Sequence, residues 1–344
     1  MSMKKTGLKI ALIPLSALAT LLVLDLIVRI AAPLRFKPDQ DAPLFASKTY
    51  RLSKTKELVY EQLPNSDVIV DGIDYRINAY GFRDKPYRIA KSQDKRVIFV
   101  GDSLTYGWLV PLKDTYHKQL EGLWKSEDRA VDVMGMGVVG YNTVQEYHLI
   151  KDKVLRLNPD LVVLQIGPND FERTVGIKTV EETGKFVLIP YHDRYVPYVF
   201  NKTKFSEGLM RRSHLFKLLN LALYGFAIKR DKDYRPRDMY LPGEDRSFQY
   251  LDKIIDVLKK INIPLAVVIF PLQNHGEPYL YASLTQGIRR RLELNKVPGL
   301  DLYDLLNSGS EKELFIDGLH LTAEGNALAA RKIADFLVPL LYKK

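Results

Sequence analysis

Short apolar runs alternate with longer amphipathic stretches from Arg96 to the carboxyl end of the chain. The apolar runs are rich in Val, Ile and Leu, which predicts strands buried on both faces, at residues 97–100, 131–134, 161–166 and 264–270. The longer stretches repeat their apolar positions with helical spacing, at residues 114–125, 142–155, 248–261, 279–294 and 322–341. This alternation predicts an α/β fold, in which a central, mostly parallel sheet lies between two layers of helices.

The alternation breaks down between Phe171 and Arg246. This segment contains a hairpin-like piece at residues 186–195, an amphipathic stretch at residues 205–226 and a run of basic residues. It is too long for an ordinary connection between two elements of a compact domain. We therefore predict an insertion at about residues 171–246 that covers the site as a lid.

A different pattern precedes the first buried strand. Residues 33–95 are interrupted by Pro, Gly and Asp, which predicts a linker followed by a small β-rich annex. Within it, Val68–Val70 and Ile73–Ile77 flank Asp71-Gly72, a pair that accepts the positive φ of a tight hairpin turn. The polar turn Asn78–Asp84 follows, and we expect it to supply no more than a wall of the site.

The amino end carries the pattern of a membrane anchor. Three lysines within residues 1–9 precede the run Ile10–Val28, whose 19 residues contain a single charge, Asp25. This length is close to what a helix needs to cross a bilayer, and the positive-inside rule keeps the lysines in the cytoplasm. We expect a single-pass anchor at residues 10–32, with the rest of the chain outside the cytoplasm. Ala17–Ala19 resembles a signal-peptidase site, but the apolar run continues beyond it, which favours an uncleaved anchor.

Composition narrows the classes of partner and of chemistry. The chain has 51 Lys and Arg against 41 Asp and Glu, a net charge of +10, and no cysteine. Without cysteine it forms no disulfide, no thiolate nucleophile and no Cys-ligated metal site. Residues 201–240 hold ten basic and four acidic side chains, which favours a patch that faces anionic lipid or an acidic polymer. A solvated helical face explains the same charges, and composition alone does not decide between the two.

Small and polar residues gather where the predicted strands end, and open α/β sheets bind ligands at the carboxyl ends of their strands. These residues are Ser103 after the first strand, Gly137 and Gly140 after the second, Asn169 after the third, and Asp317 with His320 before the last helix. Each also has an ordinary structural explanation. The alternatives are a helix N-cap for Ser103, a tight turn for Gly137, a helix cap for Asn169, and the closure of a loop for Asp317 with His320.

The glycines after the second strand, Gly135-x-Gly137-x-x-Gly140, have the spacing of a dinucleotide fingerprint. That fingerprint belongs after the first strand of a nucleotide-binding unit, and an acidic residue ends a strand about 20 positions later. Neither condition is met here. We therefore expect no nucleotide cofactor.

Four short blocks carry a family resemblance. They are Gly101-Asp102-Ser103-Leu104, then Gly137 with Gly140, then Gly167-x-Asn169-Asp170, and finally Asp317-x-x-His320. In this order, and over residues 96–344, they resemble the blocks of the SGNH (GDSL) hydrolase family. The resemblance implies a flavodoxin-like α/β/α sheet, a serine esterase activity, and neither a cofactor nor a metal. The chain departs from the pattern at Gly135, where many members carry asparagine.

The resemblance also implies a role for each of these residues. Ser103 is the implied nucleophile, His320 the base that takes its proton, and Asp317 the carboxylate that orients the imidazole. The backbone N–H groups of Ser103 and Gly137 and the side-chain amide of Asn169 are the implied donors of an oxyanion hole. A histidine suits the role of base because an unperturbed imidazole titrates near neutral pH.

The other histidines are weaker candidates for the base. Of these, His275 is the only rival because it too follows a predicted strand. Unlike His320, His275 has no acidic partner at a fixed spacing, and the sequence shows no paired-histidine spacing for zinc. Packing or surface roles are expected for His117 and His148. His192 and His214 lie in the insertion and could touch substrate, but structural roles are expected for them as well.

These observations predict a membrane-anchored serine esterase whose catalytic domain lies in the periplasm or elsewhere outside the cytoplasm. Its substrate is expected to be an acylated small molecule, an envelope glycan or a lipid, cleaved through an acyl-serine intermediate, with no nucleic acid partner. Two alternatives stay open. The same residues could pass the acyl group to a sugar hydroxyl, which would make the protein an O-acyltransferase. A non-catalytic glycan-binding protein could keep the fold, although the intact set of site residues argues against it.

Overall fold

The computed structural model describes residues 16, 20–28, 48–55, 57–58, 60–171, 176–180, 185–189, 213, 215–216, 219, 244–274, 278–308 and 313–342. The chain divides into two compact units. One unit comprises residues 1–41 with 190–235, and the other comprises residues 42–189 with 236–344. The larger unit contains both the predicted annex and the predicted sheet, and each unit is described by itself below.

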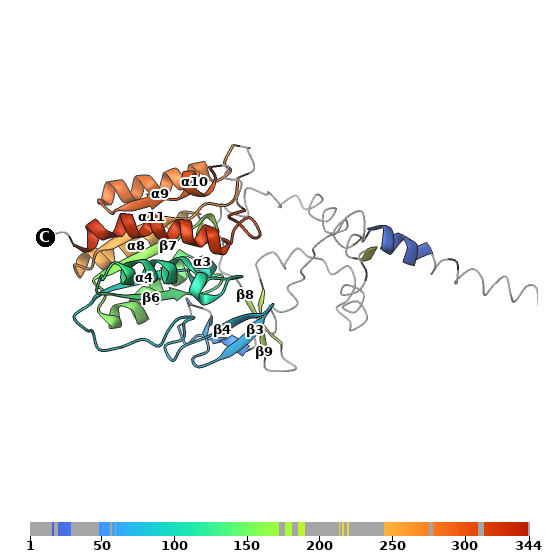
Figure 1. The fold of residues 1–344 in the computed structure, drawn as a ribbon, viewed down its shortest axis with the longest axis horizontal. Coiled ribbons are helices and arrows are strands. Elements are labelled where there is room, and N and C mark those ends of the chain that lie inside the picture. Colours follow the sequence, from blue (N-terminus) through green and yellow to red (C-terminus); the bar gives the residue numbers. More distant parts are fainter. Residues whose placement is uncertain are drawn as a thin grey trace, which may run out of the picture. The chain divides into compact units, whose positions relative to one another are not determined.

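The larger unit is built around a five-stranded sheet (Figure 1). Its strands are β5 (Lys95–Gly101), β6 (Val131–Gly137), β7 (Leu161–Ile166), β10 (Leu265–Ile269) and β11 (Gly299–Asp301). The spatial order is β11-β10-β7-β5-β6, and every pairing is parallel. Counted along the chain this is the order 2-1-3-4-5 of a flavodoxin-like sheet, so the predicted parallel α/β architecture is confirmed.

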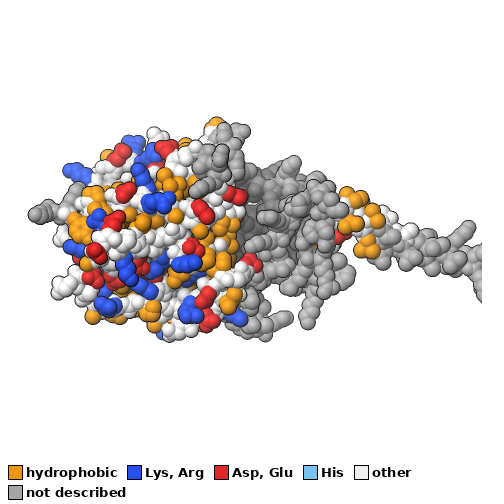
Figure 2. Space-filling model, in the orientation of Figure 1, with side chains coloured by type: hydrophobic (Ala, Val, Ile, Leu, Met, Phe, Trp, Pro, Cys, Tyr) orange, Lys and Arg blue, Asp and Glu red, His pale blue; other side chains and the backbone are white. Residues whose placement is uncertain are grey.

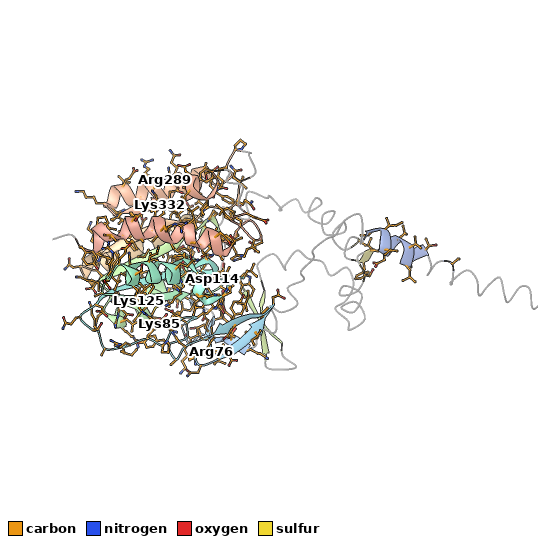
Figure 3. All side chains as sticks on the ribbon, in the orientation of Figure 1. Arg76, Lys85, Asp114, Lys125, Arg289 and Lys332 are labelled. Carbon is orange, nitrogen blue, oxygen red and sulfur yellow. The ribbon has the colours of Figure 1, made fainter. Side chains whose placement is uncertain are left out.

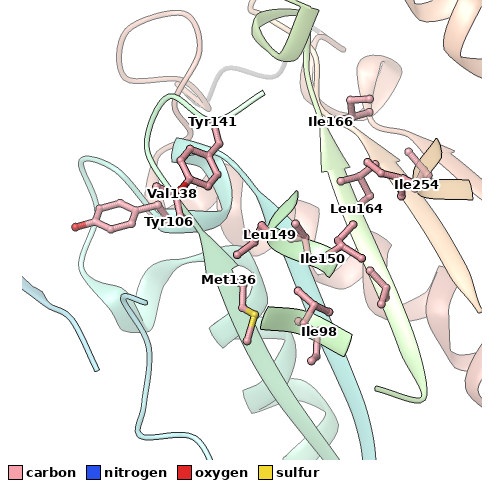
Figure 4. Close-up of a cluster of buried hydrophobic side chains, with 14 of the residues drawn as sticks. Ile98, Tyr106, Met136, Val138, Tyr141, Leu149, Ile150, Leu164, Ile166 and Ile254 are labelled. Atoms are coloured by element: carbon pink, nitrogen blue, oxygen red, sulfur yellow. The ribbon is translucent and has the colours of Figure 1, made fainter. Parts of the chain in front are cut away.

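Helices cover both faces of this sheet. They are α3 (Ser103–Tyr106), α4 (Tyr116–Ser126), α5 (Thr143–Leu149), α8 (Glu244–Lys260), α9 (Ala282–Asn295), α10 (Tyr303–Leu306) and α11 (Ala323–Leu341). The apolar side chains of α4, α10 and α11 pack on one face, and those of α5, α8 and α9 pack on the other. Figure 4 shows part of the second layer, where Ile98 and Leu164 of the sheet meet Leu149 and Ile254.

Alternation along the strands explains why they are apolar throughout. In β10, Leu265, Val267 and Ile269 face α8 and α9, whereas Ala266 and Val268 face α11. Both sets are buried because both faces carry helices. The continuous apolar runs of the sequence therefore predicted these strands close to their observed bounds.

The second strand differs from its prediction. A strand at residues 131–134 with a glycine-rich turn was expected, but β6 continues to Gly137. A Cβ on Gly135 would lie 2.4 Å from His117 Nε2, and one on Gly137 would lie 2.1 Å from the backbone nitrogen of Tyr106. These two glycines therefore allow α4 and α3 to approach the strand closely, and they do not form a turn.

The annex packs against the sheet within the same unit. Its hairpin joins β3 (Asp67–Val70) to β4 (Ile73–Arg76), and Asp71 and Gly72 have φ values of 51° and 79°, as the Asp-Gly pair predicted. A second pair, β1 (Tyr50–Leu52) with β2 (Tyr60–Gln62), was not predicted. Figure 3 shows Lys85, at the end of the annex, whose Nζ forms ion pairs with Glu121 of α4 and with Asp132 of β6.

The predicted insertion is described only in part. A hairpin forms from β8 (Gly176–Val180) and β9 (Lys185–Ile189), so it begins earlier than the predicted residues 186–195. Most of the amphipathic stretch 205–226 and most of the basic stretch 201–240 lie outside the described residues. On the face of the larger unit shown in Figure 2, basic and acidic side chains are interspersed, so this face carries no single-sign patch.

The smaller unit contains residues 20–28, which are helical. Leu21, Leu22 and Val23 of this helix are each more than half exposed. Asp25 accepts hydrogen bonds from Ser213 Oγ and from the Leu215 N–H, both at 2.8 Å. Within the described ranges, no helix combines the length and the apolar character that a bilayer crossing requires. Most of the predicted anchor, residues 10–32, falls outside those ranges.

A buried imidazole in α4 leads to a prediction about stability in acid. His117 is fully buried, packs against the rings of Tyr116 and Phe99, and neither of its ring nitrogens has a hydrogen-bond partner among the described residues. Burial, reinforced by the charge of Lys118, lowers the pKa of His117 from 6.5 to about 3. Between about pH 6.5 and 3, the imidazole therefore binds a proton in the unfolded chain but not in the folded chain. This contribution to stability is complete above pH 6.5 and is lost as the pH falls toward about 3.

We expect His117→Phe to reduce this acid sensitivity. Within that window the wild-type free energy of unfolding should fall by about 1.4 kcal/mol per pH unit on account of His117, and the variant should lack this contribution. Urea unfolding of both proteins at several pH values measures the two slopes. Equal slopes would show that the imidazole is not held neutral by its surroundings.

Candidate active site

Ser103 lies directly after the carboxyl end of β5. Asp102 is the N-cap of α3, because its Oδ1 accepts a hydrogen bond of 2.9 Å from the Leu104 N–H. Ser103 is therefore the first residue of the helix, and the alternative that Ser103 is the N-cap is wrong. The capping requirement is met by its neighbour, which leaves the Ser103 hydroxyl available for another contact.

That contact is with His320, 217 residues further along the chain. His320 Nε2 lies 2.8 Å from Ser103 Oγ, and His320 Nδ1 lies 2.7 Å from Asp317 Oδ2. Ser103 is 6% exposed and His320 is 9% exposed, whereas the Asp317 side chain is 43% exposed. The structure thus brings the predicted nucleophile, base and orienting carboxylate into one chain of contacts, with the reacting hydroxyl shielded from bulk water.

The loop between Phe315 and Leu321 sets the geometry of the acid and the base. These two residues form an antiparallel bridge, and the Ile316 N–H donates to the His320 carbonyl at 2.8 Å. Inside the loop, Asp317 Oδ1 accepts from the backbone N–H of His320 at 2.8 Å, which turns its other oxygen toward the imidazole. A spacing of three residues is therefore enough to join the carboxylate and the ring.

Asp317 is a charged partner over the whole pH range in which esters are commonly assayed. Burial raises the pKa of Asp317, but the hydrogen bond and charge of His320 and the N–H groups of His320 and Leu319 outweigh it, so that the pKa is lowered to about 2. A carboxylate at Nδ1 favours the tautomer that carries its proton there. His320 Nε2 is then the nitrogen that can accept the proton of Ser103.

Asn169 lies in the short turn Pro168–Phe171 that follows β7. Its Nδ2 donates a hydrogen bond to Asp102 Oδ2, whereas its Oδ1 has no partner among the described residues. The Asp102 carboxylate is fully buried, and an amide turned the other way would bring two oxygens together. Asp102 therefore holds the Asn169 amide in one orientation, with the second hydrogen of Nδ2 left for another acceptor.

The predicted donor Gly137 has a different orientation from the one expected. The Val138 N–H donates to the Gly101 carbonyl at 3.1 Å, so Gly137, one residue earlier, directs its N–H and C=O away from β5. The Gly137 carbonyl indeed accepts from Gln62 Nε2 at 2.8 Å on that outer side, because β6 is an edge strand. Since Ser103 follows β5, the Gly137 N–H does not point toward the serine. Gly137 provides room for α3, and the structure does not support the prediction that its N–H is an oxyanion donor.

Gln165 is a residue of the site that sequence reasoning missed. Its Oε1 accepts hydrogen bonds from the Asp102 N–H at 3.1 Å and from Thr105 Oγ1 at 3.0 Å, and Thr105 in turn contacts the Tyr116 hydroxyl at 2.8 Å. This fully buried network fixes the backbone on both sides of Ser103. The available signal was a single polar residue in the otherwise apolar strand LVVLQI, which needs a partner when buried.

The remaining histidines add nothing to this site in the part of the chain that is described. His117 and His148 lie on α4 and α5, where the first is a packing residue and the second is half-buried. The other three, His192, His214 and His275, lie outside the described residues. Across the described ranges, no three His, Cys, Asp or Glu side chains are grouped so that they could hold a metal ion.

Comparison with known proteins gives a family match over most of this unit. Residues 99–328, more than half of the chain, match the GDSL-like lipase/acylhydrolase family. The matched range contains Ser103, Asn169, Asp317 and His320. No curated protein sequence matches this chain.

Solved structures with similar folds include three esterases or lipases. A GDSL-like lipase from Bacteroides thetaiotaomicron is 18% identical with a TM-score of 0.42, covering 72% of this chain and 90% of its own. The acetyl xylan esterase AlAXEase is 19% identical with a TM-score of 0.43, and covers 71% and 100%. The psychrotrophic esterase EstA from Pseudoalteromonas sp. is 14% identical with a TM-score of 0.44, and covers 72% and 99%. At these identities and scores, the family match is the finding that bears on function.

Proposed function

Because the chain belongs to the GDSL-like lipase/acylhydrolase family and is an esterase of that family, we propose that it cleaves O-acyl esters through an acyl-serine intermediate on Ser103. One observation carries the proposal. Ser103 Oγ lies 2.8 Å from His320 Nε2, while Asp317 lies 2.7 Å from the other ring nitrogen. A serine hydroxyl becomes a nucleophile when a base accepts its proton, and this geometry supplies that base with its orienting group.

In the first half of the reaction, Ser103 Oγ attacks the carbonyl carbon of the ester and its proton passes to His320 Nε2. The imidazolium that forms is stabilised by the ionised Asp317. Collapse of the tetrahedral intermediate breaks the bond to the alcohol, which leaves with the proton returned by His320. In the second half, water attacks the acyl carbonyl carbon while His320 Nε2 takes its proton. Collapse of the second tetrahedral intermediate breaks the bond to Ser103 Oγ, which takes the proton back from His320, and the acid is released.

The negative oxygen of the tetrahedral intermediate needs donors that are in place before the reaction. We assign the Ser103 N–H, at the amino end of α3, and the second hydrogen of Asn169 Nδ2. The third donor, predicted at Gly137, is instead assigned to a backbone N–H group in the turn that follows β6. There the Tyr141 N–H donates to the Val138 carbonyl at 3.1 Å, and Gly140 has φ 76°, a conformation that favours glycine.

Replacing Asn169 with alanine should lower kcat by about 100- to 1000-fold, because one oxyanion donor is lost. KM should change little, since the charge on the substrate oxygen develops only in the transition state. Steady-state kinetics on a short-chain nitrophenyl ester measures both constants. Asn295→Ala, in a surface helix, is the matched control and should leave kcat unchanged. Equal kcat in the two variants would remove Asn169 from the donor set.

The proposed substrate class is an acyl group on an envelope glycan or on a lipid. The predicted anchor and export favour an envelope substrate, whereas the apolar residues of the insertion favour an acyl chain. Hydrolysis rates for nitrophenyl acetate and for longer nitrophenyl esters separate these two possibilities. A preference for acetate supports a glycan O-acetyl group, and a preference for long chains supports a lipid. Absence of turnover with every ester would contradict the proposed activity.

An O-acyltransferase is the second candidate. The same triad could transfer the acyl group of the acyl-serine to a sugar hydroxyl instead of to water. Adding a glycan acceptor to the assay distinguishes the two. For a hydrolase, the released acid accounts for all consumed ester. For a transferase, acylated acceptor forms faster than free acid. A non-catalytic glycan-binding protein would instead show affinity for glycans without turnover of any ester.

We further propose that residues 10–32 anchor the protein in a membrane, with the larger unit on the outer side. The support is the apolar run behind three lysines, together with the exposed apolar side chains of residues 20–28. Protease added to intact cells and to cells with opened outer membranes tests the orientation. A larger unit that stays protected until the inner membrane is broken would reverse it.

A further inference from the structure

The polar turn of the annex contains an arginine that the mechanism above does not use. Arg83 is 2% exposed, and within the described part of the chain it forms no ion pair with a carboxylate. A buried guanidinium is costly unless its N–H groups find acceptors. The acceptors of the Arg83 N–H groups therefore show which part of the fold this side chain holds.

The acceptors are backbone carbonyls around the carboxyl end of α3. Arg83 Nη1 donates to the Gly107 carbonyl at 2.5 Å and to the Tyr106 carbonyl at 3.3 Å. Nη2 donates to the Val110 carbonyl at 2.9 Å and to the Asp74 carbonyl, in the annex, at 3.0 Å. Three of the four contacts thus bind the end of the helix that carries Ser103 and the chain that leaves it, and the fourth ties them to the annex.

Two aromatic rings fix the plane of this guanidinium. The Arg83 Cζ atom lies 4.2 Å from the centre of the Tyr75 ring and 5.4 Å from that of the Tyr106 ring. The two rings are themselves stacked, with centroids 5.7 Å apart and an angle of 8° between their planes. A planar, delocalised cation satisfies this arrangement, whereas a lysine ammonium provides neither the fork of donors nor the stacking surface.

Helix α3 needs such support because it is only four residues long. A helix of that length does not hold itself together, and its last carbonyls have no partners within the helix. At its amino end, Asp102 caps the Leu104 N–H. At its carboxyl end, the cation of Arg83 binds the carbonyls that carry the negative end of the helix dipole. The nucleophile therefore lies between two caps, one from the sheet and one from the annex.

Resting on the proposed function, we propose that Arg83 is a positioning residue of the esterase, which holds α3 so that Ser103 Oγ stays against His320. The annex is then part of the catalytic apparatus rather than a neighbouring module. A second group of annex contacts holds the last residue of β6 and the loop that follows it. Gln62 Nε2 donates to the Gly137 carbonyl at 2.8 Å, and the Tyr60 hydroxyl donates to the Val139 carbonyl at 2.7 Å.

The test compares the full-length wild type with Arg83→Lys and Arg83→Gly. We expect kcat per active site to fall about 100-fold in both variants, because a small displacement of the serine is enough for such a loss. KM should stay within about twofold, since Arg83 is buried and touches no substrate. Active sites are counted by titration with a phosphonate that reacts with serine. Guanidinium ion at millimolar concentration should restore part of kcat in Arg83→Gly and none in Arg83→Lys, whose side chain fills the space.

Arg96 offers a matched control. It is 1% exposed and also binds backbone carbonyls, with Nη1 2.6 Å from the Leu157 carbonyl and Nη2 2.8 Å from the Arg88 carbonyl. It differs in its ion pair with Asp132, whose Oδ2 lies 3.2 Å from Arg96 Nε, and in lying at the amino end of β5, the end opposite Ser103. Arg96→Lys should therefore lower the thermal midpoint but leave kcat per active site unchanged, with no response to guanidinium.

The outcomes separate this inference from the function it rests on. A wild type that turns over no ester would overturn the proposed function and the inference with it. Wild-type turnover together with unchanged kcat per active site in folded Arg83 variants would overturn the inference alone. Should both Arg83 variants fail to fold, Tyr75→Phe, which loses only the hydroxyl that accepts from the Leu109 N–H at 3.1 Å, is compared with Tyr75→Leu, which loses the stacking surface as well. A kcat lower in Tyr75→Leu than in Tyr75→Phe, without a change in KM, supports the positioning role, and an equal kcat contradicts it.

Discussion

Replacing Ser103 with alanine should lower kcat for ester hydrolysis by about 10⁶-fold, leaving only the weak catalysis that bound donors provide to an attacking water. The hydroxyl is the only group that forms the acyl intermediate in the proposed mechanism, so no neighbouring side chain can replace it. Its Oγ is also the atom that His320 Nε2 contacts at 2.8 Å. Steady-state rates with nitrophenyl acetate, measured on the purified full chain, give the loss directly.

Two controls make this result specific. Ser126→Ala removes an exposed hydroxyl that donates to the Leu123 carbonyl at the end of α4, and it should keep wild-type kcat. A serine-reactive phosphonate should label the wild type and Ser126→Ala but not Ser103→Ala. Labelling of the Ser103 variant, or turnover close to that of the wild type, would place the nucleophile elsewhere.

Replacing His320 with glutamine should cost nearly as much kcat as the loss of the serine, about 10⁵- to 10⁶-fold. Without the imidazole, the Ser103 proton has no acceptor at 2.8 Å, and the ionised Asp317 loses the group that it orients. Because base and nucleophile act in one step, the double variant of Ser103 and His320 should be no slower than either single variant. Kinetics of the three variants measure this lack of additivity.

The matched control for His320 is His148→Gln, a half-buried histidine on α5 whose pKa is lowered by burial. This variant should keep wild-type kcat. Independent, additive losses from Ser103 and His320 would show that the two residues do not act as a unit. A large loss of kcat in His148→Gln would instead indicate that the catalytic base lies on α5, and it would contradict the proposed mechanism.

Local patterns predicted most of the framework because strand burial and helix amphipathicity are properties of short stretches. The run Leu161–Ile166 is β7 with the predicted bounds, and the pair Asp71-Gly72 forms the predicted hairpin turn. Prediction failed for β11 (Gly299–Asp301) and for β1, each three residues long, which are too short to show a period. It also failed at the end of β6, because glycines in a sequence suggest a turn. Only the structure shows the neighbouring atoms that a Cβ at Gly135 or Gly137 would contact.

The site was predicted to the extent that its geometry is local. Asp317 and His320 are three residues apart, and the loop that joins them needs no distant residue to bring carboxylate and ring together. The direction of the Gly137 N–H was not predictable in the same way. It depends on which residues of β6 bond to β5, and shifting that register by one residue would reverse the direction.

By itself, the sequence determined which strands are buried, where all of them but β6 end, and which residue types stand there to act as nucleophile, base and carboxylate. Only the tertiary structure decided that Ser103 and His320 meet across 217 residues, that Gln165 fixes the backbone on both sides of Ser103, and that Arg83 holds the far end of α3. The physical reason is that burial patterns are written into neighbouring residues, whereas a hydrogen bond from a distant side chain to a backbone carbonyl leaves no period or spacing in the chain. Any residue has such a carbonyl, and only packing determines which one an arginine reaches.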